Sequence, residues 1–239
     1  MLTGALIKTT LVDYPGKVAC AWFLTGCSLR CPYCYNTDSV FNSLPPEESR
    51  TEDEVFEHLI KRRNVLSGFV ISGGEPLIRT EIPSIIKKAK NTGYAVKLDT
   101  NGMHPAALEA LFEASDTSPD FIAVDIKTSP TRYNLLAGNT PLLNSCGAHE
   151  LLERTLSCVK RLPAARREFR TVLVPPLVQK ADIARMAALL PPDASWRFAP
   201  FIPGNCLDPA YNDIIPYTDE QMQSLVSYAQ SLIPDSLLR

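Results

Sequence analysis

The sequence predicts an α/β fold, a partial (β/α)6 barrel formed by a single domain over residues 1–239. Six short apolar runs alternate with segments whose apolar residues repeat with helical period, which is typical of a parallel sheet wrapped by helices. Each run precedes its helix, so right-handed crossovers should curl the sheet in one direction. Six strands rather than eight should leave such a barrel open on one side.

The expected strands are short and bounded mostly by Gly, Pro, Asp or Asn, residues that interrupt strands. They cover residues 18–24, 69–72, 94–98, 121–126, 169–174 and 196–201. In folds of this kind, ligands bind at the carboxyl ends of the strands. The segments that directly follow these runs are therefore the first places to look for a site.

Helices are expected between the strands. Thr51 and Glu54 have the spacing of a capping box, and an apolar face with Ile60 follows them. The next helix carries its apolar face on residues 82–89 and should end at Gly93. Further helices are expected over residues 106–114, 151–159, 183–190 and 222–232.

Composition excludes several classes of protein. The hydrophobic fraction of 45% is enough for an ordinary core, and 24 basic against 26 acidic residues give no support for a nucleic-acid partner. The longest apolar runs, such as residues 18–24, are far shorter than the roughly 20 residues that span a bilayer. Since the N-terminus also lacks the pattern of a secretory signal, no membrane association and a cytoplasmic location are expected.

Three of the seven cysteines, Cys27, Cys31 and Cys34, lie within eight residues directly after the first strand. Three thiolates at this spacing can hold one face of an iron–sulfur cluster if the chain turns tightly, and Gly26 and Pro32 suit such a turn. A four-iron cluster held this way leaves one iron without a protein ligand. An open metal position is where a substrate or cosubstrate can bind.

A zinc site and a chance group of buried thiols are the alternatives for these cysteines. Zinc needs a fourth ligand, yet the sequence has no second cysteine pair and its three histidines are isolated from one another. An incomplete cluster cage is therefore the better explanation. The remaining cysteines are interpreted as core thiols: Cys20, Cys146, Cys158 and Cys206.

Polar residues follow the second strand in the segment Gly73-Gly74-Glu75-Pro76. The two glycines would let the backbone approach a ligand closely, and the Glu75 carboxylate could accept hydrogen bonds from an ammonium group. Taken alone, this segment is only a turn with a charge.

A third polar group begins with Asp99 after the third strand, in the segment Asp-Thr-Asn-Gly, and a fourth contains Asp125 and Lys127 at the end of the fourth strand. Without context these are as readily a polar turn and a surface ion pair. Their position at the same edge as the first two motifs favours a shared site.

The Cys-x3-Cys-x2-Cys and Gly-Gly-Glu-Pro motifs together resemble those of the radical S-adenosylmethionine (SAM) enzymes. The resemblance implies that Cys27, Cys31 and Cys34 bind a [4Fe-4S] cluster whose fourth iron binds SAM, and that Tyr33 lies against the adenine. It also implies that the glycine-rich loop binds the methionine amino group. One electron from the cluster would cleave SAM to methionine and a 5'-deoxyadenosyl radical, with no catalytic side chain beyond the cluster.

Within this superfamily the chain resembles the activating enzymes of glycyl radical enzymes. Residues 4–17 and 205–209 are similar to the activating protein of anaerobic ribonucleoside-triphosphate reductase, although Tyr35 stands where related activases often have His. The resemblance implies that Asp99 and Asp125 contact SAM and can hold a monovalent cation, and that Lys127 contacts the methionine carboxylate. It implies a glycyl radical enzyme as partner and a flavodoxin- or ferredoxin-type electron donor.

Two other functions remain open at this point. A radical SAM enzyme acting on a small molecule, similar to the deazaguanine synthases, should need no protein partner. A non-enzymatic iron–sulfur or zinc module should show no reductive cleavage of SAM.

Overall fold

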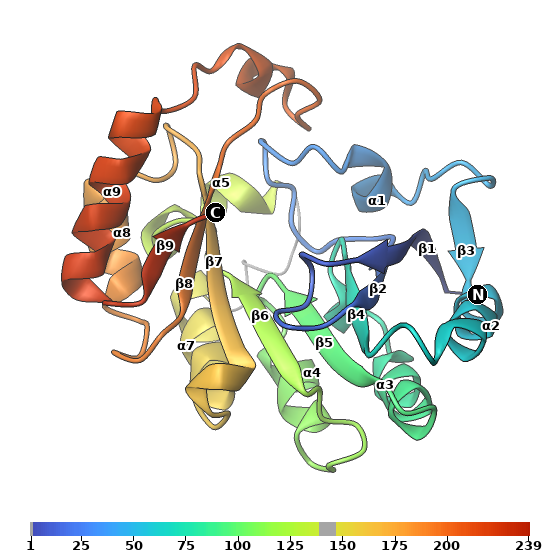
Figure 1. The fold of residues 1–239 in the computed structure, drawn as a ribbon. Coiled ribbons are helices and arrows are strands. Elements are labelled where there is room, and N and C mark those ends of the chain that lie inside the picture. Colours follow the sequence, from blue (N-terminus) through green and yellow to red (C-terminus); the bar gives the residue numbers. More distant parts are fainter. Residues whose placement is uncertain (1, 139–146) are drawn as a thin grey trace. The chain divides into compact units, whose positions relative to one another are not determined.

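The computed structural model describes residues 2–138 and 147–239, which form two compact units. The first unit comprises Met1–Cys27, Asn36–Thr100 and Ala106–Ile122, and the second comprises Ser28–Tyr35, Asn101–Pro105 and Ala123–Arg239. Both consist of strands and helices in alternation (Figure 1). The single domain over residues 1–239 stays a prediction.

In the first unit the strands lie in the order β3-β1-β2-β4-β5. Three of them are parallel and match predicted strands: β2 (Ala19–Leu24), β4 (Gly68–Gly73) and β5 (Ala95–Thr100). The other two are antiparallel and were not predicted: β1 (Thr3–Thr10) and β3 (Ser49–Thr51). Much of β1 faces solvent, so it lacks the apolar run that marks its neighbours.

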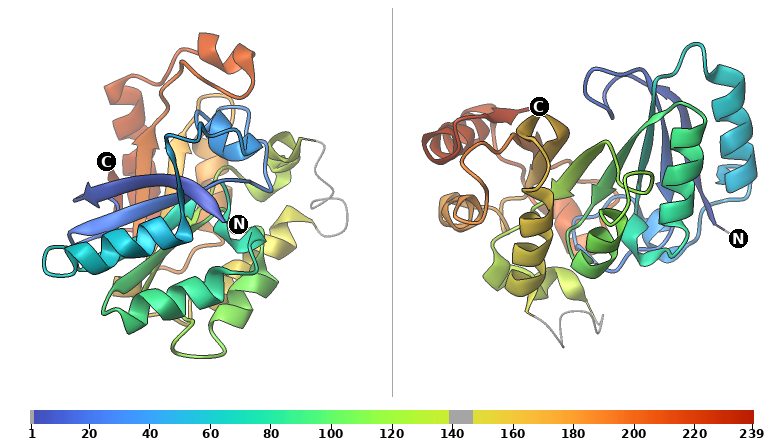
Figure 2. Two further views of the ribbon diagram at one scale, coloured as in Figure 1. Left: turned by 90° about the vertical axis from the view of Figure 1, so that its right-hand side faces the viewer. Right: turned by 90° about the horizontal axis from the view of Figure 1, so that it is seen from below.

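The helices of the first unit follow the predicted apolar faces. Helix α2 (Glu52–Arg62) begins with the expected capping box, in which the Thr51 N–H donates to Glu54 Oε2 at 2.8 Å. Helix α3 (Ile82–Asn91) lies beside α2 and buries its apolar face (Figure 2). The prediction that Ile60 belongs to the buried apolar face was wrong, because this residue is 56% exposed. Helix α4 (Pro105–Leu111) matches the helix predicted over residues 106–114 but ends earlier, whereas the short α1 (Thr37–Phe41) was not predicted.

Strand β6 (Phe121–Asp125) begins in the first unit and ends in the second. In the second unit three strands run parallel, β7 (Arg167–Leu173), β8 (Trp196–Pro200) and β9 (Ser236–Leu238). The first two match predicted strands, as β6 does, whereas the short β9 was not predicted. On β8 the rings of Trp196 and Phe198 are both buried, with their centroids 4.6 Å apart.

The helices of the second unit lie within three residues of the predicted positions, apart from the short α5. They are α5 (Asn134–Ala137), α7 (Ala148–Val159), α8 (Lys180–Ala187) and α9 (Asp219–Leu232), and α8 and α9 lie side by side (Figure 1). Single turns of 3-10 helix occur in both units: η1 (Pro76–Ile78), η2 (Pro130–Arg132), η3 (Ala164–Arg166) and η4 (Pro209–Asp213).

Three cysteines outside the predicted cluster motif are buried, as expected of core thiols: Cys20, Cys158 and Cys206. Burial raises the pKa of Cys20 to about 12. The fourth, Cys146, lies outside the described residues.

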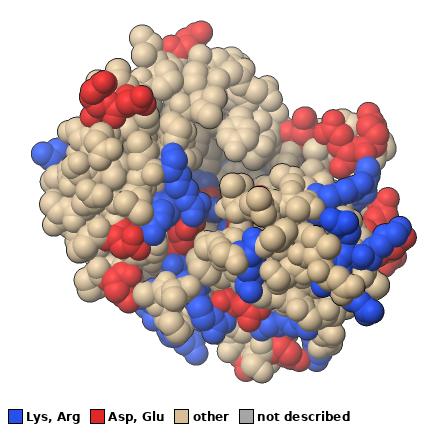
Figure 3. All heavy atoms as spheres, viewed as in Figure 1, with Lys and Arg blue, Asp and Glu red and all other residues tan. Residues whose placement is uncertain are grey.

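The described residues include no helix that is long and apolar enough to cross a lipid bilayer. Basic and acidic side chains are interspersed on the face shown in Figure 3. This pattern agrees with the balanced composition of the chain.

Candidate cofactor site

The chain turns sharply where β2 ends. Gly26 has a φ of +89°, a conformation that side chains disfavour, and its N–H donates to the Ser39 carbonyl at 2.6 Å. The Arg79 guanidinium donates to the Thr25 carbonyl at 2.7 Å. Within the first unit, this turn therefore directs the chain out of the sheet at Cys27, as the interpretation of Gly26 required.

A second tight turn lies in the second unit. The Cys34 N–H donates to the Cys31 carbonyl at 3.0 Å, so these two predicted cluster ligands are on one turn around Pro32. The backbone N–H groups of Leu207 and Asp208 donate to the carbonyls of Cys34 and Pro32, each at 2.9 Å. The segment that follows β8 thus holds the backbone of the turn that carries Cys31 and Cys34.

The three predicted cluster ligands are divided between the two units, Cys27 in the first and Cys31 and Cys34 in the second. Among the described residues, no three His, Cys, Asp or Glu side chains converge closely enough to hold a single metal ion. Cluster binding by these three cysteines stays a prediction.

The glycines of the Gly-Gly-Glu-Pro loop are required for a reason that the sequence did not indicate. Gly73 has a φ of +118°, and a Cβ atom there would collide with the backbone of Leu24. A Cβ atom at Gly74 would collide with the carbonyl of Gly26. The close approach is thus between the two loops that follow β2 and β4. The Gly74 N–H donates to the Leu24 carbonyl and the Glu75 N–H to the Gly26 carbonyl, each at 2.9 Å.

The Glu75 side chain is fully buried, and its Oε1 accepts hydrogen bonds from the Leu77 N–H at 3.0 Å and the Thr100 hydroxyl at 2.9 Å. It thereby caps η1 and joins the loop after β4 to the end of β5. A buried carboxylate held by donors stays oriented, which suits the predicted role of receiving an ammonium group.

Asp99 lies on β5, the strand that follows the Glu75 loop along the chain. Its carboxylate, like that of Glu75, accepts hydrogen bonds from two donors. Ser72 donates to Asp99 Oδ2 at 3.0 Å, and the buried ammonium of Lys97 donates to Oδ1. Lys97 and Asp99 are two residues apart on β5, so they lie on the same face of the strand. The predicted SAM contact Asp99 is therefore part of a buried ion pair.

In the second unit, Asp125 pairs with two cations. Lys127 Nζ lies 3.2 Å from Asp125 Oδ2, and Arg170 Nε lies 2.7 Å from Oδ1. Burial alone would raise the pKa of Asp125, but Arg170 and Lys127 outweigh it and lower the pKa to about 2. The carboxylate is thus ionised at any ordinary pH. The pair that the sequence suggested is thus joined by a third residue, Arg170 of β7.

This shift predicts the pH dependence of an Asp125→Asn variant. A carboxyl group whose pKa is lower in the folded protein stabilises the fold above its unfolded value near 4, and that contribution is lost as the pH falls toward 2. We expect the variant to lose about 2 kcal/mol of unfolding free energy at pH 7. Urea unfolding should show a smaller difference in unfolding free energy between the variant and wild type at pH 3 than at pH 7. An equal difference at both pH values would contradict the lowered pKa of Asp125.

Tyr33 carries a buried polar atom that none of the described residues satisfies. Its hydroxyl has no hydrogen-bond partner, although the residue is only 7% exposed. Burial raises the pKa of this phenol well above its usual value, and the nearby Lys127 opposes the shift. An unsatisfied buried hydroxyl is costly, and a bound polar group is one way to satisfy it.

Sequence reasoning missed three residues that complete these groups. Lys97 and Arg170 each stand inside a predicted apolar strand, and a charged residue in such a run was the available signal, because a buried charge needs a partner. His104 was given no role in the sequence analysis, yet its ring contacts Ser28. Because that contact joins residues 76 positions apart in the chain, no local sequence pattern could predict it.

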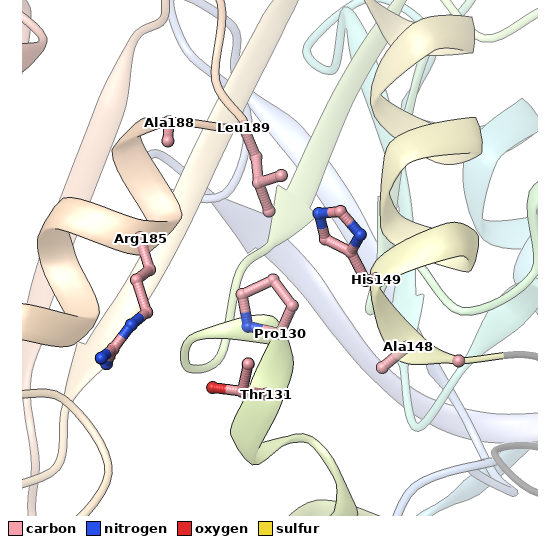
Figure 4. Close-up of a pocket in the computed structure, with 8 residues that line it drawn as sticks. Pro130, Thr131, Ala148, His149, Arg185, Ala188 and Leu189 are labelled. Atoms are coloured by element: carbon pink, nitrogen blue, oxygen red, sulfur yellow. The ribbon is translucent and has the colours of Figure 1, made fainter.

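A cavity of about 520 Å³ lies elsewhere in the second unit (Figure 4). The His149 ring and the Leu189 side chain point toward it from α7 and from the end of α8. None of the predicted site residues lines it. The lining residues are Pro130, Thr131, Gly147, Ala148, His149, Arg185, Ala188 and Leu189.

Comparison with known proteins agrees with the motifs. The sequence profile of the Radical SAM superfamily matches residues 23–190, more than half of the chain. A relative from Methanocaldococcus jannaschii, provisionally named a glycyl-radical enzyme activating enzyme, is 26% identical over 243 residues that cover 100% of this chain and 95% of that protein. The pyruvate formate-lyase-activating enzyme of Streptococcus mutans is 26% identical, over 72% of this chain and 64% of that enzyme.

Solved structures show the same fold. QueE from Escherichia coli has a TM-score of 0.58 at 15% identity, covering 99% of this chain and 92% of that one. SuiB from Streptococcus suis has a TM-score of 0.57 at 14% identity, covering 90% of this chain and 46% of that one. The predicted fold class, an α/β partial barrel of this type, is confirmed.

The chain belongs to the radical SAM superfamily. It is an enzyme of the oxidoreductase type whose cofactors are a [4Fe-4S] cluster and SAM, as the motifs implied. Its resemblance to the glycyl radical enzyme activases is confirmed by the relatives described above. The residues present fit these cofactors, because Cys31 and Cys34 share a tight turn and the Tyr33 hydroxyl is buried without a partner in the described chain.

Proposed function

We propose that this enzyme activates a glycyl radical enzyme, and that its partner is anaerobic ribonucleoside-triphosphate reductase. The observation that carries the activase assignment is the match to a relative provisionally named for that activity, which covers 100% of this chain and 95% of that protein. Residues 4–17 and 205–209 support the choice of reductase through their resemblance to its activating protein.

Residues 205–209 also contact the loop that carries Cys31 and Cys34. Leu207 and Asp208 hold the backbone of the turn that carries Cys31 and Cys34, and the Asn205 amide donates to the Tyr35 carbonyl at 3.4 Å. The segment that suggests the reductase is therefore bonded to the cysteine loop.

We assign cluster binding to Cys27, Cys31 and Cys34. The reduced cluster, when bound, supplies one electron for the cleavage of SAM, and a flavodoxin- or ferredoxin-type protein would replace that electron. The overall reaction consumes SAM, one electron and a glycine Cα–H bond, and it yields methionine, 5'-deoxyadenosine and a glycyl radical.

The other predicted site residues bind and orient SAM in this proposal. Gly73, Gly74 and Glu75 receive the methionine amino group, since the carboxylate of Glu75 is buried and held by two donors. Lys127, whose Nζ lies 3.2 Å from Asp125 Oδ2, contacts the methionine carboxylate in this proposal.

Two further contacts complete this binding site. Tyr33 provides a buried aromatic face for the adenine, and Asp99 contacts the cosubstrate beside its ion pair with Lys97. A monovalent cation at Asp99 and Asp125 stays a prediction.

The test is electron paramagnetic resonance on the reduced enzyme mixed anaerobically with SAM and the candidate reductase. We expect a protein-centred doublet that disappears when the partner glycine is replaced by alanine. Cleavage of SAM without a doublet in any glycyl radical enzyme would overturn the activase assignment. Turnover that rises with a small heterocycle and needs no protein would favour the small-molecule alternative.

A further inference from the structure

The hydroxyl of Ser28 is the meeting point of two side chains from the loop after β5. Nε2 of His104 lies 2.8 Å from Ser28 Oγ, and Nδ2 of Asn101 donates to the same oxygen at 3.3 Å. All three residues belong to the second unit. Ser28 begins the segment that carries Cys31 and Cys34.

The roles of the donors and acceptors in this group follow from its neighbours. Asn101 Oδ1 accepts a hydrogen bond from the Met103 N–H at 3.0 Å, which leaves the amide nitrogen to face Ser28. Burial lowers the pKa of His104, which favours the neutral ring, and a neutral ring can accept a hydrogen bond at Nε2. Ser28 can then receive one hydrogen bond from Asn101 and donate one to His104.

The loop that supplies these side chains is itself fixed. The Thr155 hydroxyl of α7 donates to the Gly102 carbonyl at 2.7 Å, and Gly102 adopts a φ of +79°. Its Cα faces the side chains of Leu152 and Val124. Helix α7 thus holds the loop whose side chains reach Ser28.

The segment from Ser28 to Tyr35 has other anchors along its length. The Arg30 N–H donates to the Leu136 carbonyl at 2.7 Å, and the bonds to Leu207 and Asp208 follow at the far end. The contacts of Ser28 are made by side chains, as is the bond from the Asn205 amide to the Tyr35 carbonyl at the other end of the segment. A point substitution can therefore remove the anchor at Ser28 while the backbone bonds remain.

We propose that His104 and Asn101 are positioning residues for the cysteine loop, which they clamp through the hydroxyl of Ser28 so that the bound cluster is retained. This inference rests on the proposed binding of the cluster by Cys27, Cys31 and Cys34. Groups that orient metal ligands in this indirect way typically change metal affinity or activity by about 10- to 100-fold when removed.

The test measures how fast anaerobically reconstituted enzyme loses iron to a chelator. We expect Ser28→Ala and His104→Ala each to lose iron about tenfold faster than wild type. The double variant should lose iron no faster than the faster single variant, because both substitutions remove one shared contact. His104→Gln, which keeps a polar atom near the position of Nε2, should stay close to wild type.

The matched control is His149→Ala, which removes an exposed histidine whose ring lies 3.6 Å from Glu153. It should lose iron at the wild-type rate. Circular dichroism of the apo proteins shows whether each variant is folded, and Ser28→Ala carries the test if His104→Ala is not.

Wild-type rates in both single variants, or effects that multiply in the double variant, would overturn the clamp. If the wild-type enzyme itself takes up no cluster, the proposed function fails as well. The two failures are therefore distinguishable.

Discussion

Replacing Cys31 by alanine should abolish cluster binding and lower the rate of SAM cleavage at least about 100-fold, because a cage of three thiolates has no ligand to spare. Cys31 is only 7% exposed and shares a tight turn with Cys34. Iron and sulfide analysis, together with chromatography of 5'-deoxyadenosine, measures both effects.

Cys158→Ala is the matched control for this substitution. Cys158 is a buried thiol on α7, outside the predicted cluster motif. Its replacement should leave the iron content and the cleavage of SAM unchanged. A Cys31→Ala variant that retained a full cluster would show that another ligand set holds it.

The second large effect is expected on stability, from Lys97→Met. Removing the ammonium leaves the carboxylate of Asp99 buried without its ion-pair partner, and losses of this kind cost about 3–5 kcal/mol. Ser72 continues to donate to Asp99, so the lower end of that range is expected. Urea denaturation of the apo protein measures the change.

Two comparisons separate this effect from a general loss of charge. Lys87→Met removes one partner of the exposed pair between Lys87 and Asp116, where we expect a much smaller change in stability, because solvent screens exposed charges. The double variant with Lys97→Met and Asp99→Leu should recover much of the stability, because no buried charge is left alone. A Lys97→Met protein as stable as wild type would contradict the importance of the pair.

The central parallel strands could be predicted from the sequence because they are buried almost throughout and therefore read as continuous apolar runs. Strands β2 and β4 show this plainly, and all six predicted strands were found within two residues of their expected bounds. Strand β1 was missed because its side chains are largely solvent-exposed and it is held by backbone pairing with β2 and β3.

The candidate site was predictable where residue type and spacing carry the chemistry, as in the three cysteines. It was not predictable where a partner comes from a distant segment. Arg170 lies 45 residues from Asp125, and the sequence alone showed only a charged residue inside a predicted apolar strand. The need for Gly73 and Gly74 likewise depends on the backbone of β2, which no spacing within their own loop reveals.

The account depends most directly on the cluster having one iron that the protein leaves for SAM. Electron paramagnetic resonance of the reduced enzyme, recorded anaerobically with and without SAM, tests this claim. We expect an iron–sulfur signal whose shape changes when SAM is added. A preparation that holds zinc in place of iron, or a cluster signal that SAM leaves unchanged, would contradict it.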